Sequence, residues 1–443
     1  CARLCVGFRL ELNMFPRLFA VRATSARYAR WLPLAAALLF VSPVWAGSPT
    51  SLTLDAAMRQ AIERAPMLEA RRAQSESTRQ EAARAGALPD PQLTVGIDNL
   101  AVQGPGAFTA GGDSMTMRTI GISQVLPSRS KRQAERVMGT ANADLAASSE
   151  VATALSIKQQ VAAAWITAWG AHHEAMMLQS MRQAWAQDVV VAKARLRGGT
   201  GSAAEVLAVR MESLDLENRI DEANAREAQA RASLARWLGS PIEQPLAEAP
   251  DFAALPYNEA SLLASLDRQG NLLGWPAREQ AAEAALAEAR ADKHPEWNVG
   301  LSYGSRVQGL SDMVTLQVGV SLPLFTRNRQ DRGISARAAD LDAVRDEHDD
   351  ARRQQTEAIQ SAWAQWQSLG QQVRRHRDEL LPLANDRVAL ALAAYRGGGD
   401  IQPLLDARRD EIAHHTDYAR MQAEYGRAWA ALAYLLPTSE TTP

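Results

Sequence analysis

The chain has 443 residues, of which 47% are hydrophobic and 22% are charged, and its formal net charge is −2. This length allows two or three ordinary domains or one elongated domain, and the composition is that of a folded protein. A weakly acidic chain of this kind is a poor binder of nucleic acid, because binding to phosphates requires a basic surface.

Segment 1–46 is predicted to be a secretory signal peptide. Arginines precede the apolar run WLPLAAALLF, and small residues give a cleavage site after Ala46. The alternative is an N-terminal membrane anchor, for which the apolar run is short. The segment contains six arginines, one glutamate and both cysteines, Cys1 and Cys5, so the remaining chain has a charge of −7. That chain would have no disulfide, thiol nucleophile, cysteine metal site or lipidated N-terminal cysteine. A translation start at Met14 stays open.

The first predicted elements after this segment are an amphipathic helix and a β-hairpin. The helix is TLDAAMRQAIERAPMLEARRAQSESTRQEAARAG, residues 53–86. QLTVGID alternates apolar and other residues, and this period of two indicates a strand. MTMRTIGISQ alternates less clearly, because Arg118 falls on the side of the isoleucines. The connection AVQGPGAFTAGGD is rich in glycine, so the two segments are expected to form a hairpin.

A very long helix follows, predicted from about Ser130 to Arg197. There is no proline between Pro127 and Pro241, and a helix of this length extends roughly 100 Å at about 1.5 Å per residue. After the turn RGGTGS, a return helix of about 35 residues is expected, with apolar residues at the seven-residue spacing of a coiled coil. Its seven-residue repeat consists of Val209, Leu216, Ala223, Ala230 and Trp237.

The same order of elements then occurs a second time. It comprises a broken helix around 258–292, the alternating segments WNVGLSY and TLQVGVSL, and a helix from Asn328 to Arg396 with a kink at Pro382. VAAAWITAW recurs as IQSAWAQW, ISQVLPSRSKRQ as VSLPLFTRNRQ, and RGG as RGGG. These colinear matches indicate a tandem duplication. The predicted organisation is a first repeat at 47–240, a linker at 241–257 and a second repeat at 258–443.

The predicted fold is mainly α-helical with a small β part of four strands, each with one apolar face. In an exported chain without an apolar spanning helix, such strands fit a membrane only as a closed barrel, since open edges leave backbone groups unpaired. Closure needs about eight strands or more. We therefore expect several copies of the chain to contribute strands to one shared barrel, from which the long helices continue as a tube.

Nearly all of the chain after residue 46 resembles the TolC family of outer-membrane efflux proteins, in particular its cation-efflux branch. The resemblance is carried by LTLDAAMRQAIERAPMLEA, GALPDPQLTVGIDNL, ISQVLP, VSLPLFTRNR, and the two glycine turns followed by EVL and LLDAR. It implies a homotrimer with a twelve-stranded barrel in the outer membrane of a Gram-negative bacterium and a helical barrel in the periplasm. It also implies a passive exit duct that works with a periplasmic adaptor (membrane fusion) protein and an inner-membrane pump of the resistance-nodulation-division type.

The two glycine turns are the candidate functional site. Glycine permits the positive φ that a tight reversal between antiparallel helices requires. The resemblance implies in addition that the turns form the periplasmic tip that docks the adaptor; an ordinary interhelix turn is the alternative. The candidate docking residues are Arg197, Gly198, Gly199, Arg396, Gly397, Gly398 and Gly399. The candidate aperture residues, for which a solvated helix start is the alternative, are Glu205, Asp400 and Asp406.

No catalytic motif occurs in a suitable context, so we predict neither an enzyme nor a cofactor. Soft sulfur ligands beside histidines suit Cu(I), but adjacent histidines point to different faces of a helix, and methionine is a common packing residue. We therefore favour packing or surface roles over a cation contact. The residues concerned are His172, His173, Met176, Met177, Met181, His414 and His415. A packing role is also expected for Trp165, Trp169, Trp363 and Trp366.

Three alternative functions remain at this point. A duct of the same architecture could export drugs or other small organic molecules. A periplasmic adaptor would also be exported and bear a long helical hairpin, but it would have one such hairpin where this chain has two. A structural coiled-coil protein would explain the helices and leave the four alternating strands without a purpose.

Overall fold

The computed structural model describes residues 51–306 and 309–437, and the predicted signal peptide lies outside these ranges. The described residues form one unit by their internal contacts, and every element described below belongs to it. Among the described residues, no helix is both long and apolar enough to cross a membrane.

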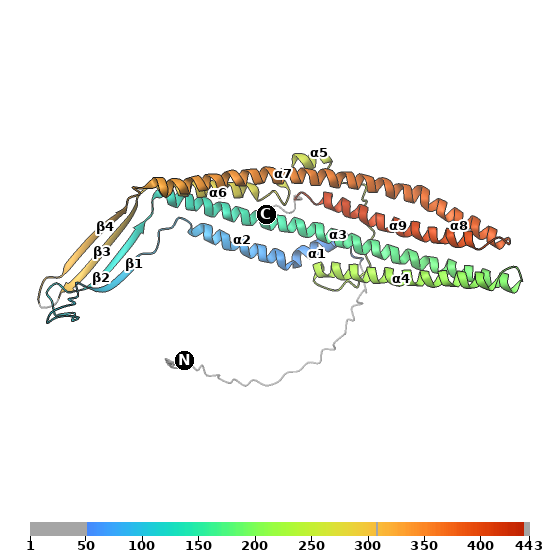
Figure 1. Ribbon diagram of the computed structural model, residues 1–443, viewed down its shortest axis with the longest axis horizontal. Helices are drawn as coiled ribbons and strands as arrows, with labels where there is room; N and C mark the ends of the chain where they lie inside the picture. The colour runs from blue at the N-terminus through green and yellow to red at the C-terminus, as the bar shows by residue number, and fades with distance from the viewer. Residues whose placement is uncertain (1–50, 307–308, 438–443) are drawn as a thin grey trace, which may run out of the picture. The chain divides into compact units, whose positions relative to one another are not determined.

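The elements of the first half follow the predicted order (Figure 1). They are α1 (Leu54–Arg64), α2 (Pro66–Arg84), β1 (Gln92–Asp98), β2 (Met117–Leu126), α3 (Arg129–Arg197) and α4 (Ala203–Leu238). The single first helix predicted from the sequence is wrong, because Pro66 divides it. Proline disfavours helical geometry in the residue before it, and Ala65 is accordingly extended, with φ −70° and ψ 109°.

The second half repeats this order with more interruptions. Its elements are α5 (Glu259–Ala264), the 3₁₀ turn η1 (Leu266–Arg268), α6 (Trp275–Ala291), β3 (Glu296–Arg306), β4 (Met313–Ser321), the 3₁₀ turn η2 (Thr326–Asn328), α7 (Gln330–Arg375), the π-helical turn η3 (His376–Leu380), α8 (Leu381–Arg396) and α9 (Gln402–Ala433). The kink predicted at Pro382 takes the form of the π-helical turn directly before it. Pro382 has no N–H to donate, and a wider local turn accommodates that loss while the helix continues.

The four strands form one antiparallel sheet in the order β1-β2-β3-β4, so β2 and β3 join the two predicted hairpins. The register aligns Leu93, Ile122, Leu301 and Leu316 in one row across all four strands. These side chains are between 50% and 70% exposed. The apolar face predicted from the alternation is therefore present, and it is uncovered among the described residues.

The long helices lie side by side beyond the sheet (Figure 1). α3 has 69 residues, which corresponds to about 100 Å. It packs against α4 of its own hairpin and against α9 of the second hairpin, and α8 packs against α9. We call this order, α4–α3–α9–α8, the helical layer; α4 and α8 are its outer members. Both glycine turns lie at the end of the layer that faces away from the sheet (Figure 1).

The largest hydrophobic core lies midway along α3. Trp165 and Trp169 are buried there, and the indole N–H of Trp165 donates to the carbonyl oxygen of Leu52 at 3.0 Å. On α7, Trp363 and Trp366 are half-buried, with ring centroids 5.2 Å apart. The packing role predicted for these four tryptophans is confirmed.

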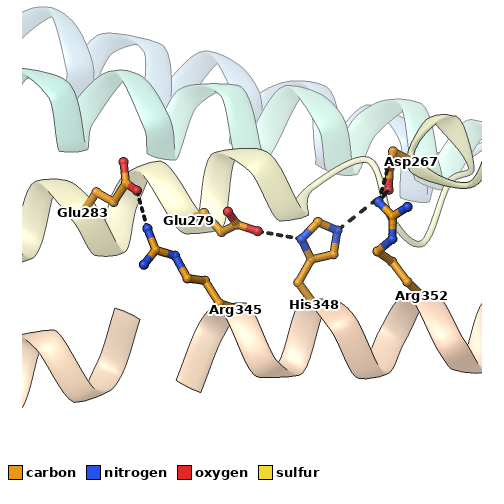
Figure 2. Close-up of polar contacts among 6 residues, drawn as sticks. All are labelled: Asp267, Glu279, Glu283, Arg345, His348 and Arg352. Atoms are coloured by element: carbon orange, nitrogen blue, oxygen red, sulfur yellow. Dashed lines mark hydrogen bonds and ion pairs between the residues drawn. The ribbon is translucent and has the colours of Figure 1, made fainter. Parts of the chain in front are cut away.

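A polar seam holds α6 and η1 against α7. Figure 2 shows its six residues, Asp267, Glu279, Glu283, Arg345, His348 and Arg352. His348 Nδ1 lies 2.5 Å from Glu279 Oε1, and its Nε2 lies 3.9 Å from Asp267 Oδ1. Arg352 donates to both carboxylate oxygens of Asp267, at 2.5 and 2.6 Å. The imidazole also stacks on Trp275, with ring centroids 5.3 Å apart. The charged pairs thus fix the short helix α6 to the long helix α7.

Candidate functional site at the two glycine turns

The first turn depends on the backbone conformation of Gly199. α3 ends at Arg197, Gly198 keeps a helical φ of −77°, and Gly199 has a φ of 75°. A Cβ added at Gly199 would meet no atom within 4 Å. The position therefore requires glycine for its positive φ and not for lack of space. The positive φ expected in this turn is found, and the surface next to Gly199 is open.

The second turn follows the same plan, and like the first turn at Gly201 it also approaches its own helix closely. Gly397 has a φ of −78°, and Gly398 has a φ of 105° with no atom within 4 Å of an added Cβ. At Gly399 an added Cβ would lie 2.9 Å from the carbonyl oxygen of Ala394. The run of three glycines thus combines a helical position, a left-handed position and a close approach of the chain to its own helix.

The structure brings the two turns together through Arg195, a residue of α3 that the sequence analysis missed. One guanidinium nitrogen, Nη1, donates to the carbonyl oxygens of Tyr395 and Gly399 in the second turn, the latter at 2.9 Å. The other, Nη2, donates to the carbonyl oxygen of Thr200 in the first turn at 3.0 Å. A basic residue in the last turn of a helix is a known partner for unpaired carbonyl groups. The position of Arg195 in the last turn of α3 was therefore the one sequence signal for this role.

Glu205 has two contacts that the predicted aperture role did not include. It forms a capping box with Ser202 at the start of α4, and its Oε2 accepts the hydroxyl hydrogen of Tyr395 at 2.9 Å. Tyr395 is fully buried, and burial together with the hydrogen bond to Glu205 raises its pKa to about 12. The phenol therefore remains a donor at every physiological pH.

The side chains of Asp400, Asp406 and Arg197 contact residues of their own turn or helix. Asp400 accepts the N–H of Gln402 at 3.3 Å, near the start of α9, and Asp406 pairs with Arg409 at 3.2 Å. Arg197 is exposed and donates to the carbonyl oxygen of Lys193 on its own helix at 3.3 Å. The seven predicted docking residues are all exposed: Arg197, Gly198, Gly199, Arg396, Gly397, Gly398 and Gly399.

Buried ion pairs hold the helical layer together behind the turns. Asp188 on α3 and Arg408 on α9 are 3% and 9% exposed, and Arg408 Nε lies 2.9 Å from Asp188 Oδ2. Burial raises the pKa of Asp188 despite the opposing effect of Arg408. Farther from the turns, Glu174 of α3 is paired with Arg226 of α4 at 3.0 Å and Arg420 of α9 at 3.1 Å. The pairs Asp188–Arg408 and Glu174–Arg420 cross from α3 to α9 and so require a definite register between the two hairpins, whereas Glu174–Arg226 lies within the first hairpin.

His172 and His173, which belong to the histidine and methionine cluster on α3, are hydrogen-bonded within the protein. No group of three or more His, Cys, Asp or Glu side chains in that part of the chain could hold a metal ion. His172 Nδ1 is hydrogen-bonded to Glu227 Oε1 at 2.9 Å, and His173 Nδ1 to the carbonyl oxygen of Trp169 at 3.0 Å. Both histidines thus have partners within the protein.

Comparison with known proteins gives a family match for the second part of the chain and similar structures for most of its length. Residues 264–437 match the family model described as outer membrane efflux protein, and no curated protein sequence matches the chain. A membrane protein from Pseudomonas aeruginosa has a TM-score of 0.74 and 17% identity, over 87% of this chain and 93% of that one. CusC, whose structures are described in terms of folding and transmembrane channel formation, has a TM-score of 0.73 and 17% identity, over 88% of this chain and 93% of that one. The outer membrane protein VceC from Vibrio cholerae has a TM-score of 0.71 and 16% identity, over 86% of this chain and 94% of that one.

These similarities confirm the predicted fold class, a mainly helical chain with a small antiparallel sheet and the architecture of TolC-like channels. The family match favours the channel over the adaptor and the structural coiled coil. Proteins of this family are passive channels of the outer membrane and not enzymes. Residues 264–437 thus match the outer membrane efflux protein family, and the chain has the fold of TolC-like channels.

Proposed function

We propose that this protein is the exit duct of a tripartite efflux pump and passes heavy-metal cations from the periplasm to the cell exterior. The observation that carries the proposal is that two surfaces adjoin in a chain whose residues 264–437 match the efflux family. A sheet with an exposed apolar face leads directly into long helices, of which α3 extends about 100 Å. The first surface suits lipid, and the second suits a passage through the periplasm.

The sheet supports a homotrimer. β1 and β4 each have a partner on one side only among the described residues. Unpaired backbone groups are not tolerated in the hydrocarbon region of a membrane, so these edges need partners. Pairing β4 of one copy with β1 of the next would satisfy both edges, and three copies would give a twelve-stranded barrel.

The helical layer supports the same ring. Its two outer helices, α4 and α8, have exposed apolar side chains at intervals of three, four or seven residues, the spacing of helix contacts. These side chains are between 58% and 73% exposed: Leu207, Met211 and Leu214 on α4, and Leu383 and Leu390 on α8. Packing α4 of one copy against α8 of the next would cover both rows.

We assign docking of the periplasmic adaptor to the two glycine turns. They lie at the end of the helices away from the sheet, and Gly199 and Gly398 both face open space. A partner helix can approach a glycine backbone closely, because no side chain intervenes. In this arrangement Glu205, Asp400 and Asp406 lie at the helix starts behind the turns, where they are candidates to line the aperture.

Heavy-metal cations are the proposed cargo because the sequence resembles the cation-efflux branch of the family and because CusC is among the similar structures. Drugs or other small organic molecules are the alternative cargo. Deleting the gene in its natural host and complementing it should separate the two. We expect loss of tolerance to copper, zinc or cobalt salts, restored by the wild-type gene, with tolerance to ethidium unchanged. The opposite pattern would assign organic cargo.

The architecture has its own test. The protein should fractionate with the outer membrane, and chemical cross-linking in detergent should reach a limit of three chains. A stable monomer, or a protein found only in the soluble periplasm, would contradict the shared barrel.

A further inference from the structure

We propose that Arg195 is the positioning residue that holds the two glycine turns together as one docking surface. This inference rests on the proposed docking function of the turns. It adds that the surface is composite, because neither turn has its position fixed by its own hairpin alone.

The contacts of Arg195 cross from one repeat to the other. The residue belongs to α3, the outgoing helix of the first hairpin, and bonds the carbonyl oxygen of Thr200 in its own turn at 3.0 Å. The same guanidinium bonds the carbonyl oxygens of Tyr395 and Gly399 in the second turn. Bonds from a charged donor are roughly twice as strong as neutral ones, and the fork of Arg allows several in fixed directions.

The charge distribution at this end of the layer favours a cation. α3 and α8 both end here, and the last carbonyls of a helix carry a partial negative charge. Tyr395 is the second-last residue of α8, so its carbonyl is one of these groups. A guanidinium between the two helix ends neutralises both, which a neutral side chain would not do.

Tyr395 extends the connection to a third helix. The guanidinium of Arg195 lies 4.1 Å from the centroid of its buried ring, a cation–π distance. The phenol hydroxyl reaches Glu205, which is also part of the cap of α4. α3, α8 and α4 are therefore connected through three side chains, and Gly399 lies three residues before the start of α9.

The first experiment measures the second turn after a change in the first hairpin. In Arg195→Ala, hydrogen–deuterium exchange of the purified full-length protein should accelerate about tenfold at Gly398 and Gly399. Lys193→Ala is the matched control, because Lys193 is a basic, exposed residue on the same helix. It should leave exchange in the second turn unchanged. Peptides around Trp165 should keep wild-type exchange in both variants, which shows that the core remains folded.

Arg195→Lys distinguishes positioning from charge. Lysine keeps the positive charge near the helix ends and has a single ammonium in place of the fork. We expect it to restore only a minor part of the protection at Gly398 and Gly399. Full protection in Arg195→Lys, or wild-type exchange in Arg195→Ala, would overturn the inference.

The second experiment connects the geometry to export. In a host that lacks the chromosomal gene, Arg195→Ala should lower tolerance to copper, zinc or cobalt salts toward the level of the deletion, at normal levels of trimer. Lys193→Ala should restore wild-type tolerance. Faster exchange in Arg195→Ala with full tolerance would refute the docking role of the connection and leave the exit duct intact. If the deletion itself changed no tolerance, the proposed function would fail, while the exchange experiment would still test the connection.

Discussion

Two glycines with the same backbone conformation allow a controlled test of the docking site. Gly199 and Gly239 have φ values of 75° and 71°, and an added Cβ would meet no atom within 4 Å at either position. Gly199 lies in the first turn, whereas Gly239 caps the other end of α4. Substitution by tryptophan costs each position about 1–2 kcal/mol, because a residue with a Cβ must adopt positive φ. The two variants therefore impose the same strain at opposite ends of one helix.

Only Gly199→Trp should impair export. Both variants should reach the outer membrane as trimers in wild-type amounts and show equal, small decreases in melting temperature. Metal tolerance of the complemented deletion strain should fall for Gly199→Trp and remain normal for Gly239→Trp, because only the first adds bulk where the partner docks. If both variants lost tolerance equally, backbone strain would be the cause. If both kept it, Gly199 would be part of an ordinary turn, and the assignment of the docking site would be wrong.

Three further predictions concern the long helices and the π-helical turn η3. Arg408→Ala leaves the buried carboxylate of Asp188 without its partner, so the free energy of unfolding in detergent should fall by about 3–5 kcal/mol. Adding Asp188→Asn should recover part of this loss. A loss below about 1 kcal/mol in Arg408→Ala would refute the contribution of the pair to stability. Replacing His172 and His173 by glutamine should leave metal tolerance nearly unchanged, and complete loss at normal trimer levels would identify them as cation contacts. Burial lowers the pKa of His376 below its ordinary value of 6.5, so the folded state takes up this proton less readily than the unfolded state. The contribution of His376 to stability should thus be fully present above about pH 6.5 and decline as the pH falls through the unfolded-state and then the folded-state pKa. The decline in melting temperature from pH 8 to pH 5 should be smaller in His376→Gln than in the wild type. An equal decline would exclude His376 as a cause of the pH dependence.

The sequence was sufficient for the elements and their order, because their signals are local. Alternation with a period of two identified the four strands, including β2, where Arg118 weakened the pattern. The absence of proline between Pro127 and Pro241 identified the length of α3. Pro66 was visible in the sequence, but its effect was underestimated, and the first helix was predicted as continuous.

The contacts that build the candidate site could not be predicted in the same way. Arg195 and Tyr395 are separated by 200 residues, and no local pattern specifies that one will meet the other. One role of Glu205, the cap of α4, could be predicted from the sequence, since Ser202 and Glu205 have the spacing of a capping box. Its second contact, with Tyr395, depends on the packing of two hairpins and required the structure.

The pairing of β2 with β3 also has a consequence for assembly. It joins the two hairpins of the sheet within one chain, where the unduplicated ancestor that the predicted tandem duplication implies would have needed contact between separate molecules. In the proposed ring, a half-length chain would assemble as six copies, so the population of complete rings would depend on the sixth power of the concentration of free chains. Fusion of the repeats reduces that dependence to the third power by mass action. A protein present in few copies per cell can then complete its ring at concentrations where six separate hairpins would remain dispersed.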